Sequence, residues 1–251
     1  MNLHHVRSGS GEPLLLLHPL GGSLVVWEPV MEKLSRERDV IAADMPGFGD
    51  SPSLADGVDP TPQALADGVA AFLDSQGIDA AHIGGNSLGA WVGLELAKRG
   101  WARSVTGLCP AGFWAHPLGP RRGIQPRTLA RLLLPLFPLL VRRPRTRALA
   151  LGGSVARPER VSPEQALRLV RAYATSPAFD GANHAMRSAL FAGLEEIDVP
   201  ITLAWGELDT VVTEPRERIP GVRWTVLRGC GHLPMWDDPE RVAAVLLEGS
   251  S

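Results

Sequence analysis

The sequence predicts an α/β fold with a mostly parallel central sheet, and three observations lead to that prediction. Short, wholly apolar segments alternate with amphipathic stretches up to residue 112 and again after residue 198. Such apolar segments are typical of strands that are buried on both faces of a parallel sheet. Glycine-rich loops follow these segments, which is the arrangement expected at the carboxyl ends of parallel strands.

Composition and charge describe an ordinary globular enzyme. The 251 residues are 45% hydrophobic and 21% charged, with a formal net charge of −2 that gives no indication of nucleic-acid binding. No apolar run reaches the roughly 18 residues that a membrane span needs. The first residues lack the pattern of a signal peptide, so a cytoplasmic location is the expectation. The two cysteines are too few for a disulfide framework and are expected to be buried free thiols.

The first part of the chain provides two strands and two helices. Residues 14–17 are all leucine and predict a buried strand that ends in the glycine-rich loop 18–22. Residues 27–34 follow as a helix and 39–44 as the next strand. Thr61 before Pro62 is an N-cap with a proline at the first helical position, so a helix is expected from there to about Gln76.

The same alternation continues on both sides of a long interruption. A strand over 80–83 leads into the turn Gly85-Asn86-Ser87-Leu88-Gly89, and the later elements are expected at 88–99 (helix), 104–109, 200–206 and 223–227 (strands), and 239–247 (helix). Residues 1–112 and 198–251 therefore form the expected α/β core.

Residues 113–197 contain no strand pattern and are predicted to be a helical lid. Helices are expected over 162–174 and 183–193. Two prolines interrupt the apolar run 132–141, which excludes a membrane span and makes a substrate-facing amphipathic surface the expectation. The region between Gly112 and Asp198 carries thirteen arginines and no lysine against six acidic residues, an excess that could attract an anionic substrate or belong to solvated helix faces.

The turn around Ser87 has the form expected of a nucleophile. A serine at the tip of a sharp strand-to-helix turn adopts a strained backbone, and Gly85 and Gly89 are needed because a Cβ there would collide with the neighbouring strand or helix. The Leu88 amide lies at a helix N-terminus, where negative charge is stabilised.

Acyl transfer also needs a base and an acid that orients it. His232 is the one histidine in a glycine-flanked turn after a late strand, and Asp209 follows the preceding strand. Ser87, Asp209 and His232 are therefore the expected catalytic triad, with Glu207 and Asp237 as alternative acids. His18 also ends a strand, but it precedes the glycine-rich loop and is expected to be a structural hydrogen-bonding residue.

An oxyanion hole needs two backbone N–H groups that point at one position. Leu88 is expected to supply one of them and Leu20 the other, because Pro19 has no N–H to donate.

The chain resembles the lid-bearing, cofactor-free enzymes of the α/β-hydrolase fold, which include carboxylesterases, thioesterases and meta-cleavage carbon–carbon hydrolases. The resemblance covers nearly the whole chain and rests on five motifs: His18-Pro19-Leu20-Gly21-Gly22, Asp44-Met45-Pro46-Gly47-Phe48-Gly49-Asp50-Ser51, Gly85-Asn86-Ser87-Leu88-Gly89, Gly206-Glu207-Leu208-Asp209 and Gly229-Cys230-Gly231-His232. It implies the chain order Ser, Asp, His. A serine nucleophile counts against the related epoxide hydrolases and haloalkane dehalogenases, which would need an aspartate.

Specificity is expected to lie in the lid and the pocket wall. Apolar side chains beside the catalytic loops could line the site, although for each of them alone core packing is the more common role. The candidates are Trp27, Phe113, Trp114, Leu233 and Trp236, with Trp91 and Met235 nearby. Arg187, on a lid helix, could anchor a carboxylate.

These observations predict a serine hydrolase that cleaves a carboxylic ester with an apolar part. Carbon–carbon bond hydrolysis and thioester hydrolysis are the enzymatic alternatives, and a ligand receptor on the same fold is the alternative without turnover. The sequence contains no cofactor motif and no metal-ligand spacing, so none is expected. A small-molecule substrate is expected, and both a monomer and a dimer remain open.

Overall fold

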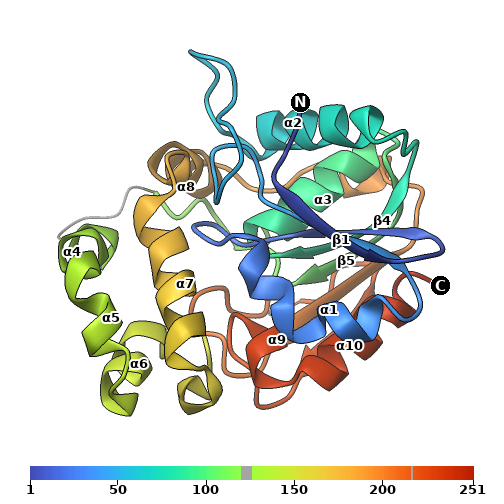
Figure 1. The fold of residues 1–251 in the computed structure, drawn as a ribbon. Coiled ribbons are helices and arrows are strands. Elements are labelled where there is room, and N and C mark those ends of the chain that lie inside the picture. Colours follow the sequence, from blue (N-terminus) through green and yellow to red (C-terminus); the bar gives the residue numbers. More distant parts are fainter. Residues whose placement is uncertain (120–125, 216) are drawn as a thin grey trace.

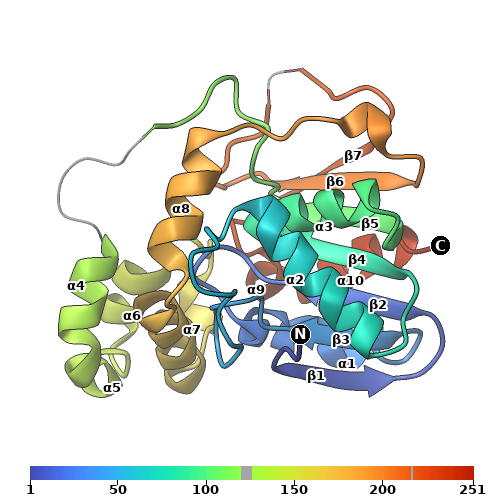
Figure 2. The same cartoon turned by 90° about the horizontal axis from the view of Figure 1, so that it is seen from above.

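The computed structural model describes residues 1–119, 126–215 and 217–251. Seven strands form one sheet in the order β1-β3-β2-β4-β5-β6-β7, which can be followed in the second view (Figures 1 and 2). β1 pairs antiparallel with β3, and every other pairing is parallel. The strands are β1 (His5–Gly9), β2 (Pro13–Leu17), β3 (Asp39–Ala43), β4 (Ala81–Asn86), β5 (Ala102–Leu108), β6 (Ile201–Gly206) and β7 (Arg223–Leu227). The predicted α/β fold with a mostly parallel sheet is confirmed.

Helices cover both faces of the sheet (Figures 1 and 2). On one face α2 (Pro62–Ser75) packs against α3 (Leu88–Lys98), and on the other α1 (Glu28–Leu34) packs against α10 (Pro239–Glu248). The Thr61 hydroxyl accepts a hydrogen bond from the Ala64 N–H at 3.1 Å, so the predicted cap of α2 is present. The helix expected from Trp27 is preceded by a 3₁₀ turn, η1 (Leu24–Trp27), and the short α9 (Pro234–Asp237) was not predicted.

Between β5 and β6 the described residues form helices and no strand. They are α4 (Pro126–Leu133), η2 (Leu134–Leu136), α5 (Phe137–Leu140), α6 (Pro144–Leu151), η3 (Pro158–Arg160), α7 (Pro163–Thr175), α8 (Phe179–Ser188) and η4 (Leu194–Glu196). α7 begins with the capping box of Ser162 and Gln165. α8 begins and ends earlier than the expected 183–193, because the backbone becomes extended at Ala189. None of the described helices is long and apolar enough to cross a bilayer.

Two hydrophobic clusters fill the molecule. The first lies around α2 and α3 and includes Phe72, Trp91 and Trp205. The second lies around α1 and α10 and also contains residues of the helical segment, such as Phe137 and Val170. The second cluster therefore joins the segment between β5 and β6 to the sheet.

Candidate active site

Ser87 occupies a strained position between β4 and α3. Its backbone has φ 55° and ψ −114°, a region that non-glycine residues rarely adopt. The Ser87 N–H donates to the Leu108 carbonyl at 2.9 Å, which ties the turn to the end of β5. A Cβ on Gly85 would lie 2.4 Å from the Gly89 carbonyl oxygen, and one on Gly89 would lie 2.2 Å from the Leu17 oxygen. The backbone geometry at Ser87 therefore depends on both glycines.

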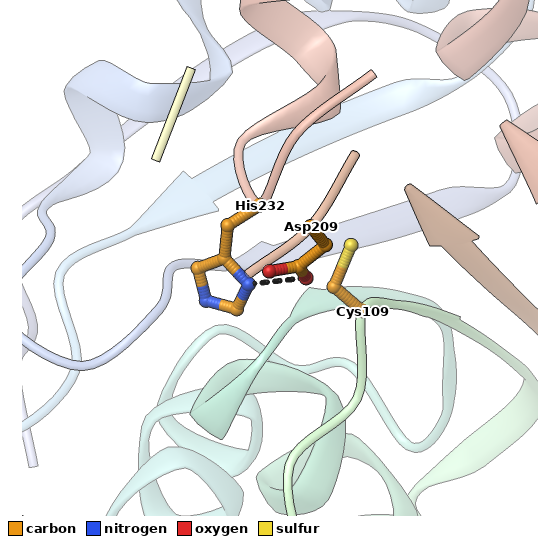
Figure 3. A group of neighbouring side chains, drawn as sticks. All are labelled: Cys109, Asp209 and His232. Atoms are coloured by element: carbon orange, nitrogen blue, oxygen red, sulfur yellow. Dashed lines mark hydrogen bonds and ion pairs between the residues drawn. The ribbon is translucent and has the colours of Figure 1, made fainter. Parts of the chain in front are cut away.

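Asp209 and His232 form a buried hydrogen-bonded pair beside the ends of β6 and β7 (Figure 3). His232 Nδ1 lies 2.7 Å from Asp209 Oδ2, and both residues are less than 10% exposed. The other carboxylate oxygen accepts the N–H groups of Val211 and Val212 at 2.7 and 3.0 Å. Burial alone would raise the pKa of Asp209, but its bonds to His232 and to these two amides lower that pKa overall. The carboxylate is thus held ionised and can fix the imidazole orientation.

Asn86 connects the serine turn to the histidine loop. Its Nδ2 donates to the Leu108 carbonyl at 2.9 Å and to the His232 carbonyl at 3.1 Å, so the residue next to Ser87 holds the backbone of His232. Ser87 Oγ and the His232 ring do not hydrogen-bond to each other. Neither Ser87 Oγ nor His232 Nε2 is among the buried side-chain atoms without a partner, so both reach solvent. Catalytic hydrogen bonds of this kind commonly tighten only when substrate is bound.

Two backbone N–H groups are free to donate hydrogen bonds to an anion. Within the described residues, neither the Leu20 N–H nor the Leu88 N–H donates a hydrogen bond to the chain. Leu88 is the first residue of α3, so its N–H also benefits from the positive end of the helix dipole. Leu20 lies in the loop after β2, where the Gly22 N–H closes a turn on the Pro19 carbonyl at 2.9 Å.

His18 holds this loop in place and takes no part in the Asp209 pair. Its Nε2 accepts the Met45 N–H at 3.0 Å, so its Nδ1 carries the proton and donates to the Pro19 carbonyl at 2.8 Å. Burial lowers the pKa of His18, against the opposing effects of Asp44 and the Pro19 carbonyl, and the ring stays neutral. The predicted structural role of His18 is confirmed.

The turn after β3 is built around Asp44. Its carboxylate accepts the Leu24 N–H at 2.6 Å and the Asp50 N–H at 3.0 Å, and it lies 2.7 Å from His4 Nδ1. The Ser51 hydroxyl donates to the Asp44 carbonyl at 2.7 Å. This network braces the loop after β2 through Leu24, which the motif alone did not indicate.

Cys109, at the end of β5, lies beside Asp209 (Figure 3). Its Sγ accepts the Gly206 N–H at 3.4 Å. One ligand-type atom from each of Cys109, Asp209 and His232 lies within 4.8 Å of the others. Burial, and then the charge of Asp209, raise the pKa of the Cys109 thiol well above its usual range, and His232 Nδ1 is already bonded to Asp209. The thiol is therefore a protonated neighbour of the pair. Both cysteines are buried and free, as expected.

Asp237, one of the alternative acids, has a different set of partners. Its carboxylate accepts the N–H of Gly231 at 2.8 Å, of Ala156 at 3.0 Å and of Arg157 at 2.8 Å. It therefore joins the loop of His232 to the segment after α6. The other alternative acid, Glu207, accepts the Gly229 N–H at 2.8 Å and braces the same loop from the β6 side.

The predicted pocket residues fall into two groups. Trp27, Leu233 and Trp236 are buried in the second hydrophobic cluster, and Trp27 has no exposed surface. Phe113 and Trp114 are partly buried against the first cluster, where Trp114 meets the edge of Trp91. Arg187 donates to the carbonyls of Gly119 and Leu118 at 2.7 and 3.3 Å, so its guanidinium holds the segment after β5.

Comparison with known proteins places this geometry in a family. The family model described as the alpha/beta hydrolase fold matches residues 12–239. The epoxide hydrolase EphH of Mycobacterium tuberculosis is 34% identical over 197 residues, which are 72% of this chain and 91% of the relative. The pimeloyl-[acyl-carrier protein] methyl ester esterase of Aeromonas hydrophila is 31% identical over 270 residues, which cover 98% of this chain and 98% of the relative. A thermophilic esterase from Thermogutta terrifontis has the same fold, with a TM-score of 0.73, 23% identity, and coverage of 98% of this chain and 92% of that chain.

Proposed function

Because the chain belongs to the α/β-hydrolase family, we propose that it is a serine hydrolase that cleaves a carboxylic ester with an apolar acyl or alcohol part. The observation that carries the proposal is the strained Ser87 turn, fixed through Asn86 to the loop that holds the Asp209–His232 pair. The predicted family is confirmed by the family match, and the prediction that the chain is an enzyme is confirmed by that match and by the relatives.

In the proposed reaction Ser87 Oγ attacks the ester carbonyl carbon while His232 Nε2 takes the hydroxyl proton. Asp209 accepts the hydrogen bond of His232 Nδ1 and stabilises the imidazolium. The N–H groups of Leu20 and Leu88 hold the oxyanion. The tetrahedral intermediate then expels the alcohol, which takes the proton from His232. Water, deprotonated by the same histidine, attacks the acyl-enzyme and releases the acid and Ser87.

The chemistry of a serine favours a carbonyl substrate over an epoxide. Attack of Ser87 on an epoxide carbon would leave an alkyl ether, which water cannot hydrolyse by addition at a carbonyl. An ester or thioester instead gives an acyl-enzyme with a carbonyl that the two free amides can stabilise. The relative of Aeromonas hydrophila is named for an ester-cleaving activity, which supports the ester assignment, and the relative EphH is named for epoxide hydrolysis, which gives the test a second substrate class.

We further propose that residues 113–197 form a lid over a small-molecule site. The loop after α6 is hydrogen-bonded to the His232 loop through Asp237, and the Leu233 N–H donates to the Ser154 carbonyl at 2.8 Å. Phe113 and Trp114 lie in the loop after β5 and remain partly exposed, so they are the apolar side chains best placed to contact a substrate.

The test is hydrolysis of 4-nitrophenyl esters of increasing acyl length by the wild type, Ser87→Ala and Ser104→Ala. Ser104 is a buried serine of β5 whose hydroxyl pairs with His82, away from the sheet edge that carries Ser87, and it is the matched control. We expect Ser87→Ala to lose about 10³-fold or more in kcat and Ser104→Ala to keep wild-type turnover. The preferred acyl length would indicate how large an acyl group the site accommodates.

Three outcomes would change the proposal. Ester turnover that survives in Ser87→Ala would exclude this nucleophile. Hydrolysis of styrene oxide with no ester turnover would move the chain to epoxide chemistry. A folded protein without activity on either would favour carbon–carbon or thioester substrates, or a ligand receptor.

A further inference from the structure

The outer side of the helical segment carries a row of exposed leucines. Leu129, Leu132, Leu136 and Leu139 are 52%, 75%, 53% and 65% exposed. Residues spaced by three, four and three positions lie on one side of a helix. The three elements that carry them, α4, η2 and α5, follow one another without a break in the chain. The opposite side of the same run is buried, at Phe137 and Val141 among others. These four residues are called the leucine face.

The leucine face lies at an extreme of the molecule. In both views α4, α5 and α6 lie on the far side of α7 from the sheet (Figures 1 and 2). All three helices pack on α7, so α7 covers only their inner side. Side chains that are more than half exposed project from the surface and do not fill a concavity. Exposed apolar groups gathered in this way mark a binding surface more often than scattered single residues do.

Positive charge prevails around the leucines, although the exposed Glu164 at the start of α7 lies within electrostatic reach of Arg142. The sequence from residue 113 to 158 contains no aspartate or glutamate. In the described part of that stretch Arg131, Arg142, Arg143 and Arg145 are exposed, and their guanidinium groups form no hydrogen bond or ion pair with described residues. Arg127 and Arg147, by contrast, are buried and hydrogen-bonded to the chain.

We propose that the leucine face docks on an anionic lipid bilayer, with the leucines in the headgroup region and the four exposed arginines at the lipid phosphates. Arginine beside projecting leucine on short helices is the pattern of interfacial attachment. A second copy of the chain fits less well, because a symmetric contact would bring arginines against arginines, and residues 113–158 supply no acid to pair with them. The attachment is peripheral, since none of the described helices is long and apolar enough to cross a bilayer.

The test is sedimentation of the full chain with vesicles of phosphatidylcholine alone or mixed with phosphatidylglycerol. The wild type is expected to bind the mixed vesicles, to bind phosphatidylcholine weakly, and to be released by salt. Leu132→Ser/Leu139→Ser is expected to bind at least about tenfold more weakly. The matched control Val6→Ser/Val58→Ser changes two apolar residues that are 46% and 47% exposed elsewhere, and its binding should stay within about twofold of the wild type.

A second variant keeps the test decisive if the leucine variant misfolds, which far-UV circular dichroism would reveal. Arg142→Gln/Arg143→Gln/Arg145→Gln changes only exposed groups and is also expected to weaken binding about tenfold or more. The proposal is overturned if the wild type does not bind, or if folded leucine variants bind as tightly as the wild type. It is also overturned if the wild type forms an oligomer that the leucine variant dissociates, because the face would then be a contact between copies of the chain. Retention on immobilised polyglutamate without vesicle binding would overturn it as well and would assign the face to an acidic protein.

Discussion

At the scale of single residues, backbone strain is confined to the candidate active site. Ser87 and Cys109, with φ of 55° and 47°, are the two non-glycine residues with positive φ in the described part of the chain. Both follow strand ends at the same sheet edge, and each such conformation costs on the order of 1–3 kcal/mol. The cost persists because the packing around β4 and β5 determines the backbone path there.

The strain at Ser87 predicts that the site reduces stability. Ser87→Gly should raise the free energy of unfolding by about 1 kcal/mol, because glycine adopts this backbone without steric cost. Ser87→Ala should leave it within about 0.5 kcal/mol of the wild type, since the Ser87 hydroxyl has no hydrogen-bond partner among the residues that the structure describes. Urea unfolding of the three proteins measures this. A glycine variant less stable than the alanine variant would contradict it.

Asp209 predicts a specific acid dependence of stability. Its pKa is lowered in the folded chain, so its contribution is complete above the unfolded pKa of about 3.9 and is lost as the pH falls through the lower, folded pKa. The difference in unfolding free energy between the wild type and Asp209→Asn should therefore be constant near neutral pH and shrink below about pH 4. Urea unfolding over a pH series measures it. A difference that stays constant down to pH 3 or lower, or that grows, would show that the carboxylate is not stabilised in this way.

The two thiols should be inert in the folded chain. Burial raises the pKa of Cys230 to about 12 and raises that of Cys109 well above its usual range, so thiolate is scarce at neutral pH. Iodoacetamide at pH 8 should label neither cysteine in the native protein and both in urea, as mass spectrometry would record. Rapid labelling of the native chain at either position would contradict the burial described here.

At the scale of elements, Asp237 at the end of α9 connects two segments that are far apart in sequence. The three amides on its carboxylate come from the His232 loop and from the segment after α6. Charge-assisted bonds to a buried carboxylate are stronger than neutral ones. The position of the histidine loop therefore depends on the helical segment as well as on the sheet.

Asp237→Asn is expected to lower kcat on the best ester about tenfold or more with a smaller effect on KM, and to destabilise the chain by about 1–3 kcal/mol. An asparagine places an N–H₂ group against backbone donors, which would displace the loop of His232. Steady-state kinetics and urea unfolding measure the two effects. The neighbouring Asp238→Asn is the control: Asp238 accepts the Arg241 N–H as the cap of α10, and asparagine caps equally well. Equal losses in both variants would mean that the effect is not specific to the His232 loop.

At the scale of the whole molecule, the helical segment and the sheet share one core. The second hydrophobic cluster contains Leu14 and Leu16 of β2 together with Val155, Leu169 and other residues of the segment. Neither part can expose its side of that cluster without exposing the other. The segment is thus part of the cooperative unit even though it interrupts the order of strands.

This shared core predicts a single unfolding transition. Urea curves from far-UV circular dichroism, which reports the helices, and from tryptophan fluorescence, which reports mainly the buried Trp27, Trp91 and Trp205, should coincide. An early loss of helix signal with unchanged fluorescence would mean that the segment unfolds separately.

The sequence by itself determined the elements and their order. Four leucines in a row, glycine after each strand, and a serine flanked by glycines are local patterns, and local sterics are enough to interpret them. They placed the six parallel strands, the elbow at Ser87, and the loops of Asp209 and His232, whereas the antiparallel edge strand β1 was not predicted. The roles of those three residues remain proposals, but their positions followed from where each strand ends.

Only the tertiary structure decided which segments meet. Cys109 beside Asp209, Asn86 on the His232 carbonyl, and Asp237 between two loops are contacts across 100, 146 and 80 residues, which no local pattern encodes. The apolar run 132–141 suggested a substrate-facing amphipathic surface, yet Leu132, Leu136 and Leu139 are more than half exposed, because α7 covers only the inner side of these helices. Side-chain identity sets local backbone preference, whereas long-range neighbours are fixed by packing, and that is the physical reason the two sources of information differ.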